Sequence, residues 1–202
     1  MSKGMKILAV VAVVAVILGW KGCSSYNNLV GLDESVNSAW AQVQNQYQRR
    51  ADLIPNLVET VKGAANFERE TLEAVIQARA SATRPEINAG DLLNNPQAFQ
   101  QFQQAQDNLG AALGRLLVVV ERYPELKANQ NYRDLQTQLE GTENRISVER
   151  KRFNEVVQNY NSTRRVFPTN IFAGMFGFQQ RPYFEATTQA QEAPKVDFGG
   201  NK

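Results

Sequence analysis

Apolar residues recur at intervals of three and four along most of this chain, which is the spacing of one face of an α-helix. Such stripes cover residues 27–52, 55–82, 96–122 and 127–166. No segment alternates apolar and polar residues with a period of two, so we expect no sheet. The pattern predicts an all-α fold in which four long helices bury their stripes against one another.

Prolines mark the expected ends of these helices. Pro55 is expected to end the first helix and begin the second, because the residue before a proline is pushed out of helical geometry. Pro124 and Pro168 are expected to close the third and fourth helices. The longest connection, residues 83–95, is rich in Pro, Gly, Asn and Asp. Short connections elsewhere predict an elongated antiparallel four-helix bundle with coiled-coil-like packing.

A separate apolar run, residues 7–20, contains no charged side chain. A helix extended to residues 4–23 spans about 30 Å, the thickness of a hydrocarbon core. We therefore expect a single-pass signal anchor in the lipid bilayer. Two alternatives stay open, acylation of Cys23 and cleavage as a signal peptide, although the residues before Cys23 match both patterns poorly.

Basic residues near this segment predict its orientation in the membrane. Lys3 and Lys6 precede it, whereas Lys21 is the only basic residue after it before Arg49. The positive-inside rule then keeps the N-terminus in the cytoplasm, with the bundle on the periplasmic or extracellular side of a bacterial cell membrane. Since successive helices alternate in direction, the 83–95 loop and the C-terminal tail are expected at the membrane-proximal end.

The chain is thus expected to have three parts. Residues 1–25 form the membrane anchor, residues 26–168 form the bundle, and residues 169–202 form a tail that is rich in aromatic residues and disordered from residue 185. Six aromatic residues cluster around the start of the tail: Phe167, Phe172, Phe176, Phe178, Tyr183 and Phe184. So dense a cluster rarely faces water, so it either folds back on the bundle or forms an interfacial belt or a subunit contact.

Charge and composition exclude several classes of function. The formal net charge is +2, and residues 23–202 carry nineteen basic against twenty acidic residues, which leaves no electrostatic footprint for nucleic acid. The chain has no histidine and a single cysteine. Imidazole ligands, Ser-His and Cys-His nucleophilic sites and an intrachain disulfide are therefore excluded. We expect no metal, no cofactor and no catalytic residues.

Two polar residues occupy apolar stripe positions of the last predicted helix. Thr142 and Glu149 fall where the spacing calls for buried side chains. A buried carboxylate must be paired, so we expect an arginine partner such as Arg79 or Arg115 and a polar contact that sets the register of the helices.

Several blocks resemble the LemA family. They are Tyr26-Asn27-Asn28-Leu29-Val30, Ala39-Trp40-Ala41-Gln42-Val43, Asp52-Leu53-Ile54-Pro55-Asn56-Leu57, Tyr123-Pro124-Glu125-Leu126-Lys127 and Leu139-Glu140-Gly141-Thr142-Glu143-Asn144-Arg145-Ile146. The resemblance implies a bacterial protein with an N-terminal membrane helix, an elongated bundle and no established biochemical activity. Some members of the family take part in magnetosome membrane formation.

The function predicted from these features is that of a membrane-anchored scaffold or interaction protein. It is expected to form homo-oligomers and to contact another membrane protein. The alternatives are a carboxylate-based enzyme and a lipoprotein sensor that binds a small ligand within the bundle.

Overall fold

The computed structural model describes residues 3–63, 67–83 and 89–185. Every regular element in these ranges is an α-helix, as the apolar periodicity predicts. The helices in chain order are α1 (Lys3–Lys62), α2 (Arg69–Ala82), α3 (Ala89–Asn94), α4 (Pro96–Val120), α5 (Pro124–Ala128), α6 (Gln130–Arg165) and α7 (Thr169–Met175).

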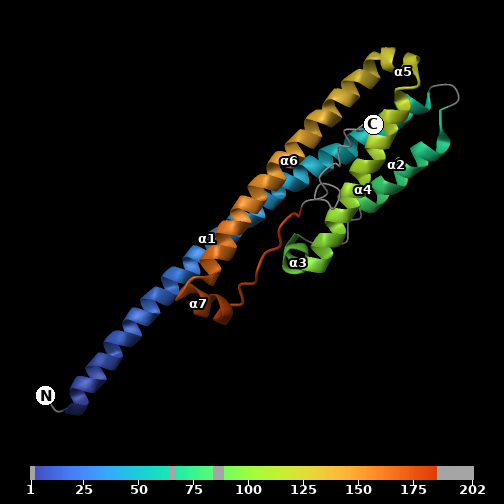
Figure 1. Ribbon diagram of the computed structural model, residues 1–202. Helices are drawn as coiled ribbons and strands as arrows, with labels where there is room; N and C mark the ends of the chain where they lie inside the picture. The colour runs from blue at the N-terminus through green and yellow to red at the C-terminus, as the bar shows by residue number, and fades with distance from the viewer. Residues whose placement is uncertain (1–2, 64–66, 84–88, 186–202) are drawn as a thin grey trace, which may run out of the picture.

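The helices form two antiparallel pairs that lie side by side in an elongated rod (Figure 1). The longer pair is α1 with α6, and the shorter pair is α2 with α4. The short helix α5 lies at the end of the rod far from the N-terminus, whereas α7 lies beside α1 near the opposite end of α6. The predicted all-α antiparallel bundle is confirmed, and the start of the tail lies, as expected, toward the apolar end of α1.

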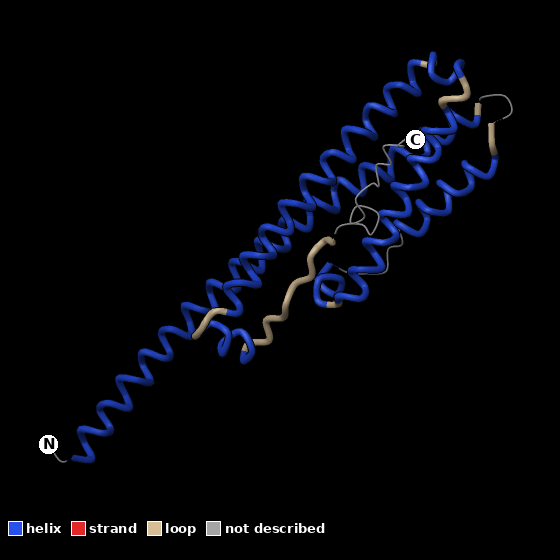
Figure 2. Tube along the Cα trace, in the orientation of Figure 1, coloured by secondary structure: helices blue, strands red, loops and turns tan. Residues whose placement is uncertain are grey.

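Helix α1 begins in the apolar segment and continues into the bundle without interruption. Figure 2 shows its N-terminal part extending beyond every other described element. The most apolar window of 18 residues has a mean hydropathy of 2.2, and only 6% of that window is buried. Among the described helices, α1 is the one that is long and apolar enough to cross a membrane.

The predicted helix break at Pro55 is wrong, because α1 runs through this proline. A proline inside a helix removes the hydrogen bond to the carbonyl four residues earlier, which here belongs to Ala51. The Arg79 side chain of α2 donates its Nε–H to the Ala51 carbonyl oxygen at 2.9 Å. This donor replaces the one that Pro55 lacks, so the buried carbonyl is not left unpaired.

The first reversal of the chain therefore follows Lys62 instead of residue 54. It lies after Gly63 and before α2 begins at Arg69, and residues 64–66 lie outside the described part of the chain. Beyond them, the Phe67 ring packs on that of Tyr123 with centroids 5.0 Å apart.

The predicted loop over residues 83–95 contains a short helix. Residues 84–88 lie outside the described part, but Ala89–Asn94 form α3. Leu92 and Leu93 are buried, so this turn is held against the bundle by apolar contacts. Asn95 then caps α4, since its Oδ1 accepts hydrogen bonds from the next two free backbone N–H groups at 3.1 Å each.

Two apolar cores follow one another along the rod. The distal core is mainly aliphatic and joins α1, α2, α4 and α6; its fully buried members include Leu57, Val61, Val75, Leu116 and Val120. The core nearer the N-terminus is mainly aromatic, and its members include Trp40, Tyr47, Phe99, Phe153, Tyr160 and Phe184. The tail contributes Phe184 to this second core.

Candidate functional site

The aromatic tail divides into a buried part and an exposed part. Phe184 is buried, and its ring lies 4.9 Å from that of Phe99, 5.4 Å from that of Phe153 and 6.1 Å from that of Trp40, centroid to centroid. Phe178 is partly buried against the same core. This part of the tail folds back on the bundle, one of the two outcomes that the sequence left open.

Residues 178–185, called the strap below, are extended and carry no regular secondary structure. Figure 1 shows the strap running from α7 along the rod toward α4. Gln103 of α4 accepts a hydrogen bond from the backbone N–H of Glu185 at 3.1 Å and donates to its carbonyl oxygen at 2.7 Å. Asn154 of α6 makes the same pair of hydrogen bonds with Phe184, at 2.9 Å in both directions.

A third amide, Asn161 of α6, holds the backbone of Arg181. It accepts from the N–H at 3.0 Å and donates to the carbonyl oxygen at 2.9 Å. The Arg181 side chain is also fixed: it forms a 2.6 Å ion pair with Asp33 of α1, donates to Asn94 of α3, and lies over the Tyr160 ring at 5.9 Å. One strap residue therefore joins α1, α3 and α6.

The three amides replace the partner strand that an extended segment normally needs. Each satisfies one N–H and one carbonyl of the strap, which would otherwise be left without partners. Such contacts are made to the backbone and do not depend on side-chain identity. The side chains of Arg181 and Phe184, three residues apart, therefore set which sequence fits this position.

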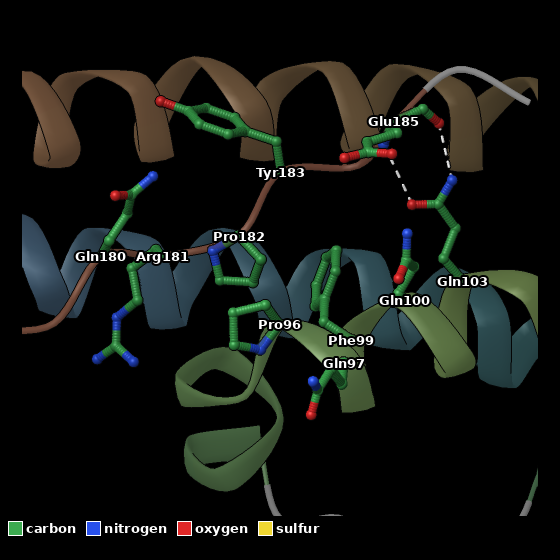
Figure 3. Close-up of a pocket in the computed structure, with 10 residues that line it drawn as sticks. All are labelled: Pro96, Gln97, Phe99, Gln100, Gln103, Gln180, Arg181, Pro182, Tyr183 and Glu185. Carbon is green, nitrogen blue, oxygen red and sulfur yellow. Dashed lines mark hydrogen bonds between the residues drawn. The ribbon is translucent and has the colours of Figure 1, made fainter.

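A groove of about 450 Å³ runs beside the strap and the start of α4. Figure 3 shows Pro182 of the strap and Pro96 of α4 in this groove, with Gln103 reaching the backbone of Glu185. The groove is open to solvent, and its lining combines proline rings with glutamine amides.

A buried arginine ties the helices together above this site. Arg50 of α1 is 2% exposed; it pairs with Glu143 of α6 at 2.7 Å and donates to the side-chain and backbone oxygens of Gln106 in α4 at 2.5 and 3.1 Å. Gln106 in turn donates to the carbonyl of Ala82 at 2.9 Å. This chain of hydrogen bonds reaches all four long helices.

A second arginine performs a similar role one layer nearer the N-terminus. Arg150 of α6 donates to the Tyr47 hydroxyl at 2.5 Å and pairs with Asp107 at 2.8 Å, and its guanidinium lies 4.9 Å from the centroid of the Phe184 ring. Burial raises the pKa of Tyr47 to about 12, although Arg150 opposes this shift. The phenol is therefore neutral at ordinary pH and accepts the hydrogen bond from Arg150.

Thr142 and Glu149, the two polar residues predicted to set the register of the helices, differ in whether their buried polar atoms have hydrogen-bond partners. Thr142 is buried, but its hydroxyl donates to the Gln138 carbonyl of its own helix at 2.7 Å. Glu149 has one buried carboxylate oxygen without a hydrogen-bond partner among the described residues. The expected pairing of Glu149 with Arg79 or Arg115 is not found, because Arg79 bonds to the Ala51 carbonyl and the carboxylate–arginine pairs form at Arg50 and Arg150 instead.

The exposed part of the tail consists of α7 and the residues next to its two ends. Its large apolar side chains, called the collar below, are Val166, Phe167, Ile171, Met175 and Phe176. Phe172, on the inner face of α7, lies against Gly22 of α1, and the Phe176 ring packs edge-on against Tyr26 at 4.9 Å. Tyr183 is exposed at the edge of the groove. The predicted tail aromatics thus lie at three places: the aromatic core, the surface around α7 and the edge of the groove.

Sequence reasoning missed the residues that hold the strap and the buried arginines. Gln103 and Gln106 carried a signal, because both fall on the apolar face of the third predicted helix. The asparagines of α6 gave none, since a long polar helix contains many amides. Among the described residues, no group of three or more acidic or cysteine side chains is placed to hold a metal ion.

The amino-acid sequence is similar to those of known bacterial proteins. A model of the LemA family matches residues 39–198. Magnetosome protein MamQ 2 of Paramagnetospirillum magneticum is 26% identical over 196 residues, which cover 90% of this chain and 70% of that protein. MamQ of Magnetospirillum gryphiswaldense is 27% identical over 89% of this chain and 70% of its own length. Protein LemA of Metamycoplasma hominis is 24% identical over 85% of this chain and 72% of its own length.

Proposed function

This chain belongs to the LemA family, and we propose that it is a membrane-anchored interaction protein whose single-pass N-terminal helix presents a rigid helical rod to protein partners. The observation that carries the proposal is the continuity of α1, which passes from the apolar segment into the bundle as one helix of 60 residues. At 1.5 Å per residue such a helix is about 90 Å long. With no linker between anchor and bundle, the rod has a fixed direction relative to the bilayer.

The proposal includes self-association through the outer face of α2 and α4. These helices flank an open groove of about 550 Å³ whose lining is small or amide-bearing, with Arg115 as its one charged member. Depletion of charge is typical of the centre of a protein interface, where burial of unpaired ions is costly. Ala111 is exposed in this groove and offers a place to test it.

The proposal assigns no catalytic role to the rod. Glu143 and Asp107 are held by Arg50 and Arg150. Glu149 has one buried carboxylate oxygen without a hydrogen-bond partner among the described residues, but it belongs to no group of acidic side chains there that is placed to hold a metal ion. A carboxylate enzyme or a small-ligand sensor needs an enclosed pocket with convergent polar groups. The grooves along the described part of the rod lie instead at its surface.

The anchoring half of the proposal is tested by washing vesicles with alkaline carbonate. The full chain is expected to stay in the pellet, and its complete release would refute the anchor. Mass spectrometry of the mature N-terminus tests the lipoprotein alternative, since Cys23 is exposed and free. Sidedness stays a prediction from the flanking lysines, tested by labelling Val148→Cys in a Cys23→Ser chain with a membrane-impermeant maleimide on intact cells.

The interaction half is tested by light scattering of the full chain in mild detergent. We expect a mass of more than one chain, and the Ala111→Arg variant is expected to reduce it to one. Ala41→Arg, at an exposed alanine of α1 outside the groove, is the matched control and is expected to leave the mass unchanged. A wild-type chain that is monomeric at all concentrations, or equal effects of both variants, would contradict self-association at this face.

A further inference from the structure

The collar is an apolar surface that stays largely exposed in the described chain, although Phe176 packs one edge against Tyr26. Phe167 is 76% exposed, Met175 65% and Ile171 57%. The opposite face of α7 is packed, since Ala173 is buried and Phe172 lies against α1. α7 is therefore a short amphipathic helix with its inner face on the bundle and its outer face free.

The position of α7 along α1 is fixed by close contacts. A Cβ atom placed on Gly22 would lie 3.0 Å from a ring carbon of Phe172, so the ring occupies the space that this glycine leaves open. One turn further along α1, Tyr26 packs edge-on against Phe176 at 4.9 Å and Phe178 at 5.8 Å. α7 thus lies level with residues 22–26 of α1.

That level coincides with the edge of the bilayer, if α1 spans it as the proposed function holds. The uncharged run of residues 7–20 is centred between residues 13 and 14. Half of a hydrocarbon core is about 15 Å, or about ten helical residues, which places its boundary close to residue 23. The headgroup region adds several ångströms beyond that boundary, so α7 lies within it.

The charges around the collar suit a lipid surface. Lys21, Arg164 and Arg165 lie beside it, and Arg165 is exposed. No acidic residue occurs in residues 1–32 or 156–184, the segments that form this end of the rod. Basic residues beside an apolar face bind anionic headgroups while the apolar side chains enter the boundary between headgroups and acyl chains.

We propose that the collar is a second lipid-binding element, which inserts into the headgroup boundary of the same membrane that α1 crosses. The occupant is the lipid surface, because α7 is held at the bilayer edge and its free apolar face lies close to the basic residues Lys21 of α1 and Arg165 of α6. With α1 and α7 both in contact with lipid, the rod is fixed to the membrane at two places and does not pivot about a single helix.

The test uses the full chain in nanodiscs of phosphatidylcholine and phosphatidylglycerol, one chain per disc. In a Cys23→Ser background, Met175→Cys carries an environment-sensitive fluorophore. Val118→Cys, at an exposed apolar position of α4 near the distal end, is the matched control. Val14→Cys, in the apolar part of α1, reports on the anchor itself. Quenchers are lipids with a nitroxide near the headgroup or deep in the acyl chain, and iodide in the water.

The label at residue 175 is expected to emit at shorter wavelength, to be quenched by the shallow nitroxide and to be protected from iodide. The label at residue 118 is expected to emit at the wavelength typical of water, to be quenched by iodide and to be unaffected by either nitroxide. Equal behaviour of the two labels overturns the collar proposal. Protection from iodide only when several chains share a disc, without nitroxide quenching, assigns the collar to a second copy and also overturns it. Failure of the label at residue 14 to respond to the deep nitroxide refutes the anchor instead, so the two failures are distinguishable.

Discussion

We expect the hydrogen bond from Arg79 to the Ala51 carbonyl to stabilise the part of α1 that runs through Pro55. The change to make is Arg79→Met, which keeps an unbranched apolar side chain but removes every donor. The Ala51 carbonyl, in a residue only 3% exposed, would then have neither the backbone N–H that Pro55 lacks nor the guanidinium. Changing Pro55→Ala restores the backbone donor and gives the control background.

The size of the effect follows from the cost of an unpaired buried carbonyl. Removing one partner of a buried hydrogen bond costs about 1–3 kcal/mol, with charged donors toward the upper end. Arg79→Met should therefore lower the free energy of unfolding by about 2 kcal/mol in the natural chain. In the Pro55→Ala background the carbonyl is paired within the helix, so only the packing of the arginine stem is lost. The coupling between the two substitutions is expected to be about 1–2 kcal/mol.

The assay is urea unfolding of the four proteins of this double-mutant cycle in mild detergent, followed by far-ultraviolet circular dichroism at 222 nm. A coupling of this size corresponds to a difference of several degrees in melting temperature for a chain of this length. The same loss of stability in both backgrounds would refute the reasoning, because Arg79 would then act by packing or charge and not by replacing the donor that Pro55 lacks.

Three further outcomes are expected. Gly141→Ala should raise the free energy of unfolding by about 0.5–1 kcal/mol, because an added methyl group meets nothing within 4 Å and alanine favours helix; a lower melting temperature would contradict this. Asn161→Ala should leave two backbone groups of the strap unpaired, destabilise the fold by about 2 kcal/mol and speed chymotrypsin cleavage after Phe184; unchanged cleavage would mean that the amide does not hold the strap. Because burial raises the pKa of Tyr47 from 10 to about 12, its contribution to stability is present below pH 10 and lost as the pH rises through 12. Unfolding at pH 9 and 12 should show a loss of about 2 kcal/mol that Tyr47→Phe lacks.

Much of the fold could be predicted from apolar spacing, because that spacing reports which face of a helix is buried. Val36, Trp40, Val43 and Tyr47 are all buried on one face of α1, as their intervals of three and four require. Pro96 begins α4 as predicted, whereas Pro124, expected to close the third helix, follows the end of α4 and itself begins the short helix α5, where the missing N–H of proline costs nothing. The same local rule failed at Pro55, because the compensating donor comes from a residue 28 positions away.

The site was less accessible to sequence reasoning, because its contacts join segments far apart in the chain. The aromatic density of the tail indicated that some of it would be buried, and Phe184 is. Which aromatic residue enters the core is decided by Gln103, Asn154 and Asn161, which fix the register of the strap. Asparagine and glutamine on a solvated helix look the same in sequence whether they face water or hold a backbone. The ion pairs of Arg50 and Arg150 were missed for the same reason, since neighbouring arginines are exposed.

The strap links the collar to the bundle, because its backbone is held by α6 and α4. α7 follows α6 directly and is followed by the strap, so its position is set from both sides. Arg164, at the end of α6, donates to the Phe178 carbonyl at 2.8 Å, and Asn161 holds Arg181 three residues later. If the collar lies in the lipid boundary, these contacts transmit the direction of the bundle to the membrane surface. Releasing the strap with Asn161→Ala should then also weaken the nitroxide quenching at residue 175 while leaving α1 in the bilayer, an effect that a merely structural tail would not produce.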